Sequence, residues 1–203
     1  MPATVNAADI ELIPADYFRL LTRTEIFPDI SRPLELDVGC GDGTFLLAMA
    51  QHHPERDFLG IERLGGRVKK ICRKAARAGL TNVRVLCLES GYALGWLLPG
   101  GCARRLHLLF PDPWPKAKHA ARRFMQPDNL AALHRVLAPG GELLFKTDHP
   151  EYFTSACEVL DDSPLFQRTE WPGAEAFYPI TDFEELWLSQ GCTINAARWI
   201  KQP

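Results

Sequence analysis

The sequence predicts an α/β fold, a doubly wound and mostly parallel sheet with helices on both faces. Two observations predict this fold. From residue 34 onward, short apolar runs alternate with longer segments of helical period, which is the pattern of successive strand-helix-strand units. The first apolar run also ends at three closely spaced glycines, which is typical of a strand, a tight turn and a helix start at a ligand-binding edge.

The expected elements follow in chain order. Strands are expected at residues 34–38, 57–61, 83–88, 105–110 and 142–146, and helices at 43–52, 65–78, 92–98, 127–137, 152–160 and 182–189. Glycine and proline at 78–79, 99–101 and 139–141 provide the helix ends and turns between them. A last strand is expected at 192–200. No crossover of the kind that connects the earlier strands precedes it, so we expect it to pair antiparallel. Residues 1–12 have no clear period and are expected to form a flexible N-terminal arm, while residues 14–21 resemble a short helix.

Length and composition favour one domain over residues 1–203, because 203 residues with 46% hydrophobic content can bury one good core and no linker is visible. The chain has no apolar run of about 18 residues and no signal-peptide pattern, so we expect a soluble cytoplasmic protein that does not contact membranes. The six cysteines form no CxxC pair and lie in apolar segments. We therefore expect neither a disulfide nor a metal site.

The charge is distributed unevenly along the chain. The formal net charge is −2, yet residues 63–123 hold 14 Lys and Arg side chains and only 2 acids. This segment indicates a nucleic-acid partner. The alternative is an exposed helix face within residues 67–77 whose charges are merely solvated.

The glycine turn predicts a nucleotide-type cofactor. Gly39, Gly41 and Gly43 follow the pattern GxGxG, which suits S-adenosylmethionine better than the GxGxxG pattern of NAD-binding proteins. Glu62 follows Gly41 by 21 residues, about the separation needed to reach ribose hydroxyls. A glycine-rich turn alone can be only a compact connection, but Asp37 before it and Glu62 after it favour the cofactor.

A proline-rich loop at residues 110–123, FPDPWPKAKHAARR, follows the fourth expected strand. In an open α/β sheet, the carboxyl ends of the strands form the edge where ligands bind. Three prolines stiffen the loop and would present Asp112 and Trp114 in a defined geometry that can hold a planar base. The alternative is that the prolines and the tryptophan only plug the end of the sheet.

Two further segments are expected at the same edge: 145–149 after the fifth strand and 181–184 before the late helix. Thr181 and Glu184 could equally form a capping box, in which both side chains satisfy helix N–H groups.

On the basis of these residues, the chain resembles the bacterial tRNA (guanine-N7-)-methyltransferases over residues 16–199. The motifs are FPDPWPKAKHAARR at 110–123, GIE at 60–62, KTDH at 146–149 and TDFEE at 181–185. The resemblance implies a class I methyltransferase fold, which is Rossmann-like, and S-adenosyl-L-methionine as cofactor. It implies that the cofactor site is lined by Asp37, Glu62, Glu89 and Asp112, and that the target guanosine is met by Lys116, Asp148, Thr181, Asp182, Phe183 and Glu184.

The chain departs from the family pattern at four positions. Asp37 stands where the family usually has Glu, and Glu89 where it usually has Asp, so each site keeps its charge and cofactor binding is expected to survive. Lys118 replaces the usual Arg and Ala121 the usual Lys, which weakens two phosphate contacts.

The implied reaction needs no general base, because N7 of guanine already carries an in-plane lone pair and catalysis is mainly alignment. We expect Asp112, the catalytic residue, and Asp148 to hydrogen-bond the N1–H and amino edge of guanine, with Trp114 in stacking or loop support. The RNA backbone is expected to meet Lys116, His119, Arg122 and Arg123. The expected partner is tRNA, bound by a monomer or weak homodimer.

Two alternatives remain open at this point. One is an exocyclic-amine methyltransferase, since Asp-Pro-Trp resembles an Asp/Asn-Pro-Pro-aromatic loop, although its second proline is missing. The other is a non-catalytic RNA-binding protein that kept the methyltransferase fold.

Overall fold

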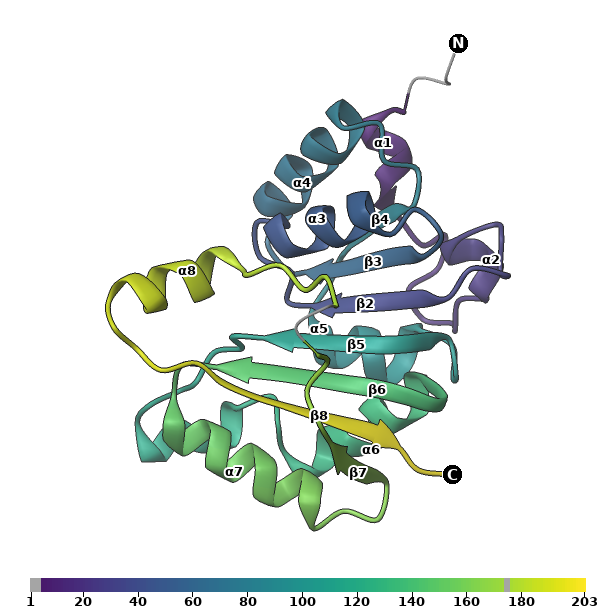
Figure 1. The fold of residues 1–203 in the computed structure, drawn as a ribbon. Coiled ribbons are helices and arrows are strands. Elements are labelled where there is room, and N and C mark those ends of the chain that lie inside the picture. Colours follow the sequence, from purple (N-terminus) through teal and green to yellow (C-terminus); the bar gives the residue numbers. More distant parts are fainter. Residues whose placement is uncertain (1–4, 174–175) are drawn as a thin grey trace.

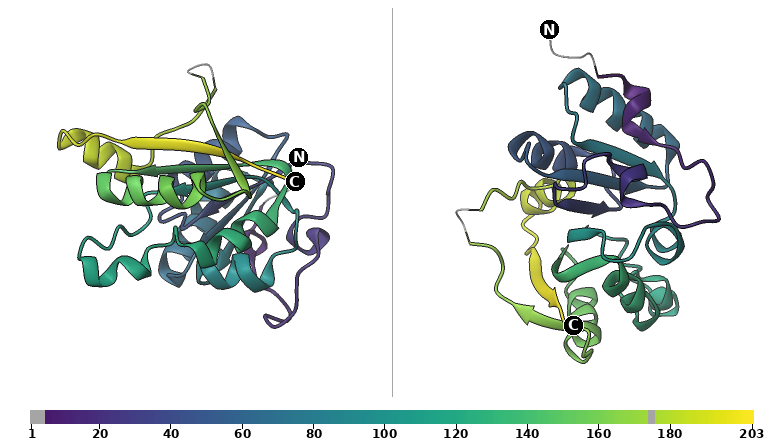
Figure 2. Two further views of the ribbon diagram at one scale, coloured as in Figure 1. Left: turned by 90° about the horizontal axis from the view of Figure 1, so that it is seen from below. Right: turned by 90° about the vertical axis from the view of Figure 1, so that its right-hand side faces the viewer.

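The computed structural model describes residues 5–173 and 176–203, which form one mixed sheet with helices on both faces (Figures 1 and 2). The strands are β1 (Glu11–Leu12), β2 (Leu34–Val38), β3 (Asp57–Glu62), β4 (Val83–Cys87), β5 (Ala103–Leu109), β6 (Leu137–Thr147), β7 (Phe166–Thr169) and β8 (Asn195–Lys201). The α-helices are α1 (Ala7–Ile10), α2 (Arg23–Ile26), α3 (Thr44–His52), α4 (Gly65–Arg77), α5 (Ser90–Tyr92), α6 (Pro127–Val136), α7 (Pro150–Asp161) and α8 (Asp182–Ser189). A π-helical turn, η1 (Ala93–Leu97), continues α5, and a 3-10 segment, η2 (Ala117–Arg122), follows β5.

The strand order is β1-β4-β3-β2-β5-β6-β8-β7. The first six of these strands run parallel, whereas β8 pairs antiparallel with both β6 and β7. The prediction of a doubly wound, mostly parallel sheet with a late antiparallel strand is therefore confirmed. Because β2 to β6 are parallel, their carboxyl ends meet at one edge, on the left in Figure 1, where α8 also lies.

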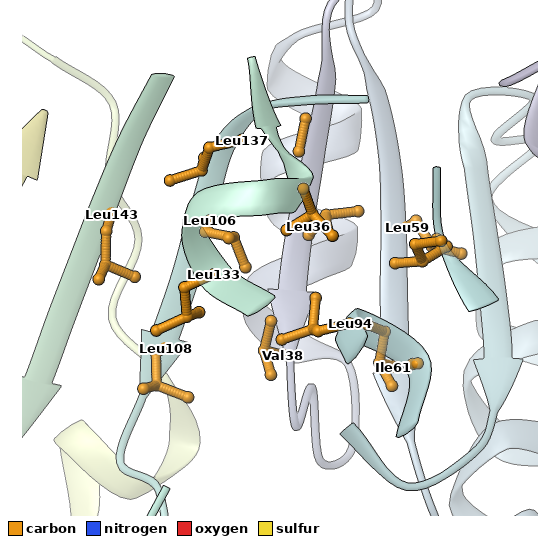
Figure 3. Packing of buried hydrophobic residues seen from close by; sticks show 14 of the residues in the cluster. Leu36, Val38, Leu59, Ile61, Leu94, Leu106, Leu108, Leu133, Leu137 and Leu143 are labelled. Atoms are coloured by element: carbon orange, nitrogen blue, oxygen red, sulfur yellow. The ribbon is translucent and has the colours of Figure 1, made fainter. Parts of the chain in front are cut away.

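One face of the sheet is apolar because alternate residues of each strand point to it. Leu36 and Val38 of β2 and Leu106 of β5 pack there against Leu94 of η1 and Leu133 of α6 (Figure 3). All five side chains are buried. This packing fixes the register of the strands and thereby the positions of their carboxyl ends.

The other face of β2, β5 and β6 carries polar side chains, although these are buried too. Glu35, Asp37, His107 and Lys146 are each less than a tenth exposed. They lie on the side of α3, where Phe45 contacts Tyr178 from the segment between β7 and α8 with ring centroids 5.0 Å apart. The described residues of that segment, 170–173 and 176–181, lie over the sheet face, and the latter lead into α8 (Figure 2). Buried charges of this kind need partners, and their pairing forms part of the candidate active site.

The N-terminal region differs from expectation. Residues 7–12 form α1 and β1, and β1 pairs with β4 through Glu11 opposite Val85, so the predicted arm is wrong for these residues. Ile10 is fully buried among side chains of α3 and α4. Burial of this apolar side chain stabilises a helix of one turn, which is too short to give a periodic signal.

Several other elements differ from expectation. The strand expected at 142–146 begins at Leu137, so the turn expected at 139–141 lies within β6, where a register shift against β5 accommodates it. Residues 14–21 form no helix, and a short helix begins instead at Arg23. The helix expected at 92–98 starts at Ser90 because Glu89 caps it, and β7 was not predicted at all. None of the helices in the described residues is both long and apolar enough to cross a membrane.

Candidate active site

The glycine turn joins β2 to α3 at the carboxyl edge of the sheet. Gly39, Gly41 and Gly43 have φ of 76°, 59° and 82°, in the left-handed region that favours glycine. A Cβ atom on Gly43 would lie 2.8 Å from Cγ1 of Ile71, whereas a Cβ on Gly39 or Gly41 would meet no described atom within 4 Å. Gly43 is therefore needed for packing against α4, while the other two glycines leave an open backbone surface that a ligand can approach.

Two buried carboxylates flank this turn. Asp37 and Glu62 are 4% and 5% exposed, at the ends of β2 and β3. Glu62 accepts a hydrogen bond of 2.8 Å from the N–H of Leu64, and its other oxygen lies 3.6 Å from Nη1 of Arg67. Burial, followed by the charge of Glu62, raises the pKa of Asp37 to about 7. The turn is thus surrounded by negative charge and by acceptors for hydroxyl or ammonium groups.

Glu89 lies after β4 and caps α5. Its two carboxylate oxygens accept from the N–H groups of Gly91 and Tyr92 at 2.8 and 2.7 Å. It also lines an open cavity of about 630 Å³ together with Gly91, Ala121, Arg122, Arg123, Phe124, Gln126, Pro127 and Asn129. Glu89 and the end of the proline-rich loop, which are distant from each other in the sequence, thus line the same cavity.

The proline-rich loop leaves β5 in a strained conformation. Phe110 and Trp114 have φ of 52° and 43°, which is uncommon for residues other than glycine. The N–H of Phe110 donates to the carbonyl of Lys146 at 2.8 Å, so the start of the loop is tied to β6. Asp112 lies between these two residues with its side chain exposed. The loop thus presents this carboxylate at the carboxyl edge of the sheet, while its contact with a ligand stays a prediction.

The basic side chains in the second half of the proline-rich loop do not share one environment. Lys116 is exposed, His119 meets the Trp114 ring edge-on at 5.7 Å, and Arg122 lies 5.1 Å over the same ring. Arg123, in contrast, is only 9% exposed and bonds within the protein. The expectation that all four contact the RNA backbone suits the three accessible side chains and not Arg123.

The residues expected near guanosine gather at β6 and α8. Asp148 is half-buried directly after β6, and Thr181 caps α8 by accepting the N–H of Glu184 at 3.0 Å. Glu184 does not complete a capping box. Its Oε1 instead accepts from Nζ of Lys146 at 2.6 Å, with both side chains nearly buried.

Oε2 of Glu184 is buried and has no hydrogen-bond partner within the described chain. A buried carboxylate oxygen without a donor is costly, so this atom is a candidate acceptor for a ligand. Asp182 and Phe183 are exposed beside it.

Sequence reasoning missed the polar layer beneath the segment before α8. Glu35 Oε2 lies 2.9 Å from Nε2 of His107, whose Nδ1 lies 2.9 Å from the hydroxyl of Tyr178. Arg56 donates to Oε1 of Glu35 at 2.8 Å. The sequence does contain a signal for this polar layer, because polar residues alternate with leucines in LELD at 34–37 and RRLHLL at 104–109. Alternation of this kind marks a second buried polar face when a segment far away in the sequence covers it.

The strand order and the glycine turn after the central strand β2 define a class I methyltransferase fold. Solved structures agree: a 16S rRNA (adenine(1408)-N(1))-methyltransferase from Catenulisporales acidiphilia matches with TM-score 0.63 and 19% identity, covering 90% of this chain and 92% of that one. The 16S rRNA methyltransferase KamB matches with TM-score 0.62 and 20% identity, covering 88% and 93%. At these identities the likeness shows the fold alone.

Sequence comparison gives the family. A family model described as "Putative methyltransferase" matches residues 31–197. The chain is 40% identical over 157 residues to the tRNA (guanine-N(7)-)-methyltransferase of Leifsonia xyli, covering 75% of this chain and 69% of that protein. It is 33% identical over 177 residues to the enzyme of the same name from Rubrobacter xylanophilus, covering 86% and 78%. The chain belongs to the tRNA (guanine-N(7)-)-methyltransferase family, which confirms the predicted resemblance.

Proposed function

We propose that the protein transfers a methyl group from S-adenosyl-L-methionine to N7 of a guanosine in tRNA. The observation that carries this proposal is that one sheet edge holds both the open glycine turn with its buried carboxylates and the strained loop that presents Asp112. Family membership supports the same reaction.

The residues present fit the cofactor. Gly39 and Gly41 leave backbone exposed beside the end of β2, and Glu62 and Asp37 supply buried acceptors next to it. When bound, S-adenosyl-L-methionine supplies an electrophilic methyl group on a positively charged sulfur. The carboxylates favour such a cation, and Glu62 and Glu89 are suited to accept hydrogen bonds from the ribose hydroxyls and the exocyclic amino group of adenosine. We assign Asp37, Gly39, Gly41, Gly43, Glu62, Glu89 and Asp112 to cofactor binding.

The substrate side must accept hydrogen bonds, since the N1–H and amino groups of guanine are donors. Asp112 and Asp148 stand at the carboxyl ends of adjacent strands, and Oε2 of Glu184 is a buried acceptor without a donor. These carboxylates would hold guanine so that N7 meets the methyl group. Since N7 needs no deprotonation, alignment is the main catalytic contribution of Asp112.

Accessible basic side chains extend this site toward the RNA backbone. Lys116, His119 and Arg122 lie on the loop, and the exposed face of α4 adds Arg67, Lys69, Lys70, Arg73 and Arg77. Phosphates supply most of the affinity for RNA. We propose that one chain, as a monomer or weak homodimer, binds tRNA in the cytoplasm.

The test is methyl transfer from labelled S-adenosyl-L-methionine to unmodified tRNA transcripts, with the product mapped as 7-methylguanosine by chain cleavage at the modified base. We expect one modified guanosine per tRNA, and at least a hundredfold loss of rate with Asp112→Ala in a protein that still melts cooperatively. Methylation of an exocyclic amine, or cofactor binding without transfer to any RNA, would contradict the proposal and favour one of the two alternatives.

A further inference from the structure

Arg122 and Arg123 are neighbours in the sequence whose side chains lie in different environments. Arg122 is exposed and lies over the ring of Trp114. Arg123 is 9% exposed, with its guanidinium carbon 5.2 Å above the ring of Tyr152. The positive charge of Arg123 is therefore largely removed from contact with a phosphate in solution.

The guanidinium of Arg123 joins the proline-rich loop to α7. Its Nε donates to the carbonyl oxygen of Pro113 at 2.8 Å, and its Nη1 donates to Oγ of Ser155 at 3.3 Å. Tyr152, which is fully buried on the same helix, accepts from the N–H of Met125 at 3.1 Å. Arg123 itself and the backbone at Met125 are thus anchored to α7, and Pro113 is connected to the helix through Arg123.

The loop needs such an anchor. The left-handed φ angles of Phe110 and Trp114 each cost roughly 1–2 kcal/mol, and strained backbone persists only where the surroundings hold it. Prolines at 111, 113 and 115 have no N–H to donate, so bonds to the carbonyl groups become more important for holding this stretch. The Pro113 carbonyl, held by Arg123, is one residue from Asp112.

We propose that Arg123 is a positioning residue, which fixes the Pro113 carbonyl and thereby holds Asp112 in place for methyl transfer, while Arg122 contacts the tRNA. This inference rests on the proposed function, because it gives Asp112 a part in that reaction. It replaces the sequence expectation that both arginines bind the RNA backbone.

The two neighbours allow a matched experiment with Arg123→Gln and Arg122→Gln in the full chain. For Arg123→Gln we expect kcat to fall at least tenfold, KM for tRNA to stay within about twofold, and the dependence of tRNA affinity on salt to remain that of the wild type. For Arg122→Gln we expect a higher KM and a salt slope smaller by about 0.7 to 0.9, the contribution of one phosphate contact. A reduced salt slope in Arg123→Gln with normal kcat would overturn the inference.

Arg123→Lys separates charge from geometry. Lysine keeps the positive charge but lacks the planar fork that bonds two partners at once, so we expect it to recover only part of the lost kcat. Full recovery would show that charge alone matters and would contradict positioning.

Hydrogen exchange measured by mass spectrometry tests the same inference without catalysis. We expect faster exchange of the amides within residues 110–116 in Arg123→Gln, a smaller rise in Ser155→Ala, and none in Arg122→Gln, with melting temperatures within a few degrees of the wild type. Unchanged exchange in Arg123→Gln overturns the positioning role. Failure of the wild type to methylate tRNA would instead reject the proposed function, whatever the exchange shows.

Discussion

Nε2 of His107 lies 2.9 Å from Oε2 of Glu35, and both side chains are almost completely buried between β2, β5 and the segment before α8. Burial alone raises the pKa of Glu35, but the hydrogen bond with His107, together with Arg105 and Arg56, lowers it to about 2. Burial lowers the pKa of His107 despite this carboxylate. Glu35 is therefore ionised and His107 neutral, with Nε2–H donating to Glu35 and Nδ1 accepting from the hydroxyl of Tyr178.

This arrangement predicts a loss of stability in acid. The pKa of His107 is lower in the folded than in the unfolded protein, so the unfolded chain binds more protons below about pH 6.5. The contribution of neutral His107 is complete above that pH and declines as the pH falls, by up to about 1.4 kcal/mol per pH unit.

The measurement is the free energy of unfolding of wild type and His107→Asn between pH 5 and 8. Asp37, whose pKa is raised to about 7, changes stability in the opposite direction over part of this range, so the difference between the two proteins is the informative quantity. We expect the difference to shrink below pH 6.5. A difference that is independent of pH would contradict a neutral buried His107, and His134→Asn on α6 serves as the control.

The Lys146–Glu184 pair predicts a second effect on stability. Their 2.6 Å contact is nearly buried, and Nζ of Lys146 also lies over the rings of Trp171 and Tyr178 at 5.4 and 5.2 Å. Lys146→Met leaves a buried carboxylate unpaired and should cost about 3–5 kcal/mol. The double variant Lys146→Met/Glu184→Gln should recover part of this loss. Additive effects in chemical denaturation would show that the two side chains are not coupled.

The parallel sheet and most of its helices were predictable because the apolar face of each strand and the glycine turn are local signals. The position of Asp112 after β5 was predictable for the same reason, since three prolines mark its loop, and its role stays a prediction. The pairing of Lys146 with Glu184, and that of Glu35 with His107 and Tyr178, could not be predicted from the sequence. Each joins residues that are 38 to 72 positions apart. Strand pairing between β2 and β5 brings Glu35 to His107, whereas α8 and the segment before it bring Glu184 to Lys146 and Tyr178 to His107. The different environments of Arg122 and Arg123 could not be predicted either, because they depend on contacts of Arg123 with Tyr152 and Ser155 of α7.

The glycine turn predicts that two substitutions of the same kind have different effects. Alanine at Gly41 or Gly43 must adopt a left-handed conformation, which costs roughly 1–2 kcal/mol. At Gly43 the new Cβ would also approach Ile71 to 2.8 Å, which adds roughly 1–3 kcal/mol of overpacking. Thermal unfolding should therefore show the larger loss for Gly43→Ala. Gly41→Ala should stay folded but bind cofactor more weakly, and normal binding would show that its open surface is not the cofactor site.

The raised pKa of Asp37 predicts how cofactor affinity depends on pH. With a pKa of about 7, the carboxyl group is mostly protonated at pH 6 and mostly ionised at pH 8. A bound cation favours the ionised form, so affinity for S-adenosyl-L-methionine should rise with pH by roughly tenfold between these values. Calorimetry at several pH values would measure this change.

Asp37→Asn is the control that separates the titration of Asp37 from the titration of the cofactor itself. In this variant, the affinity for S-adenosyl-L-methionine should lose most of its pH dependence and should be lower than that of the wild type at pH 8. The kcat of the wild type at saturating cofactor should stay flat above neutrality, because N7 of guanine needs no general base. An affinity that rises equally in Asp37→Asn would assign the dependence to the ligand. A kcat that climbs steeply near pH 8 to 9 would indicate proton abstraction from the substrate, as an exocyclic amine requires, and would count against N7 as the acceptor.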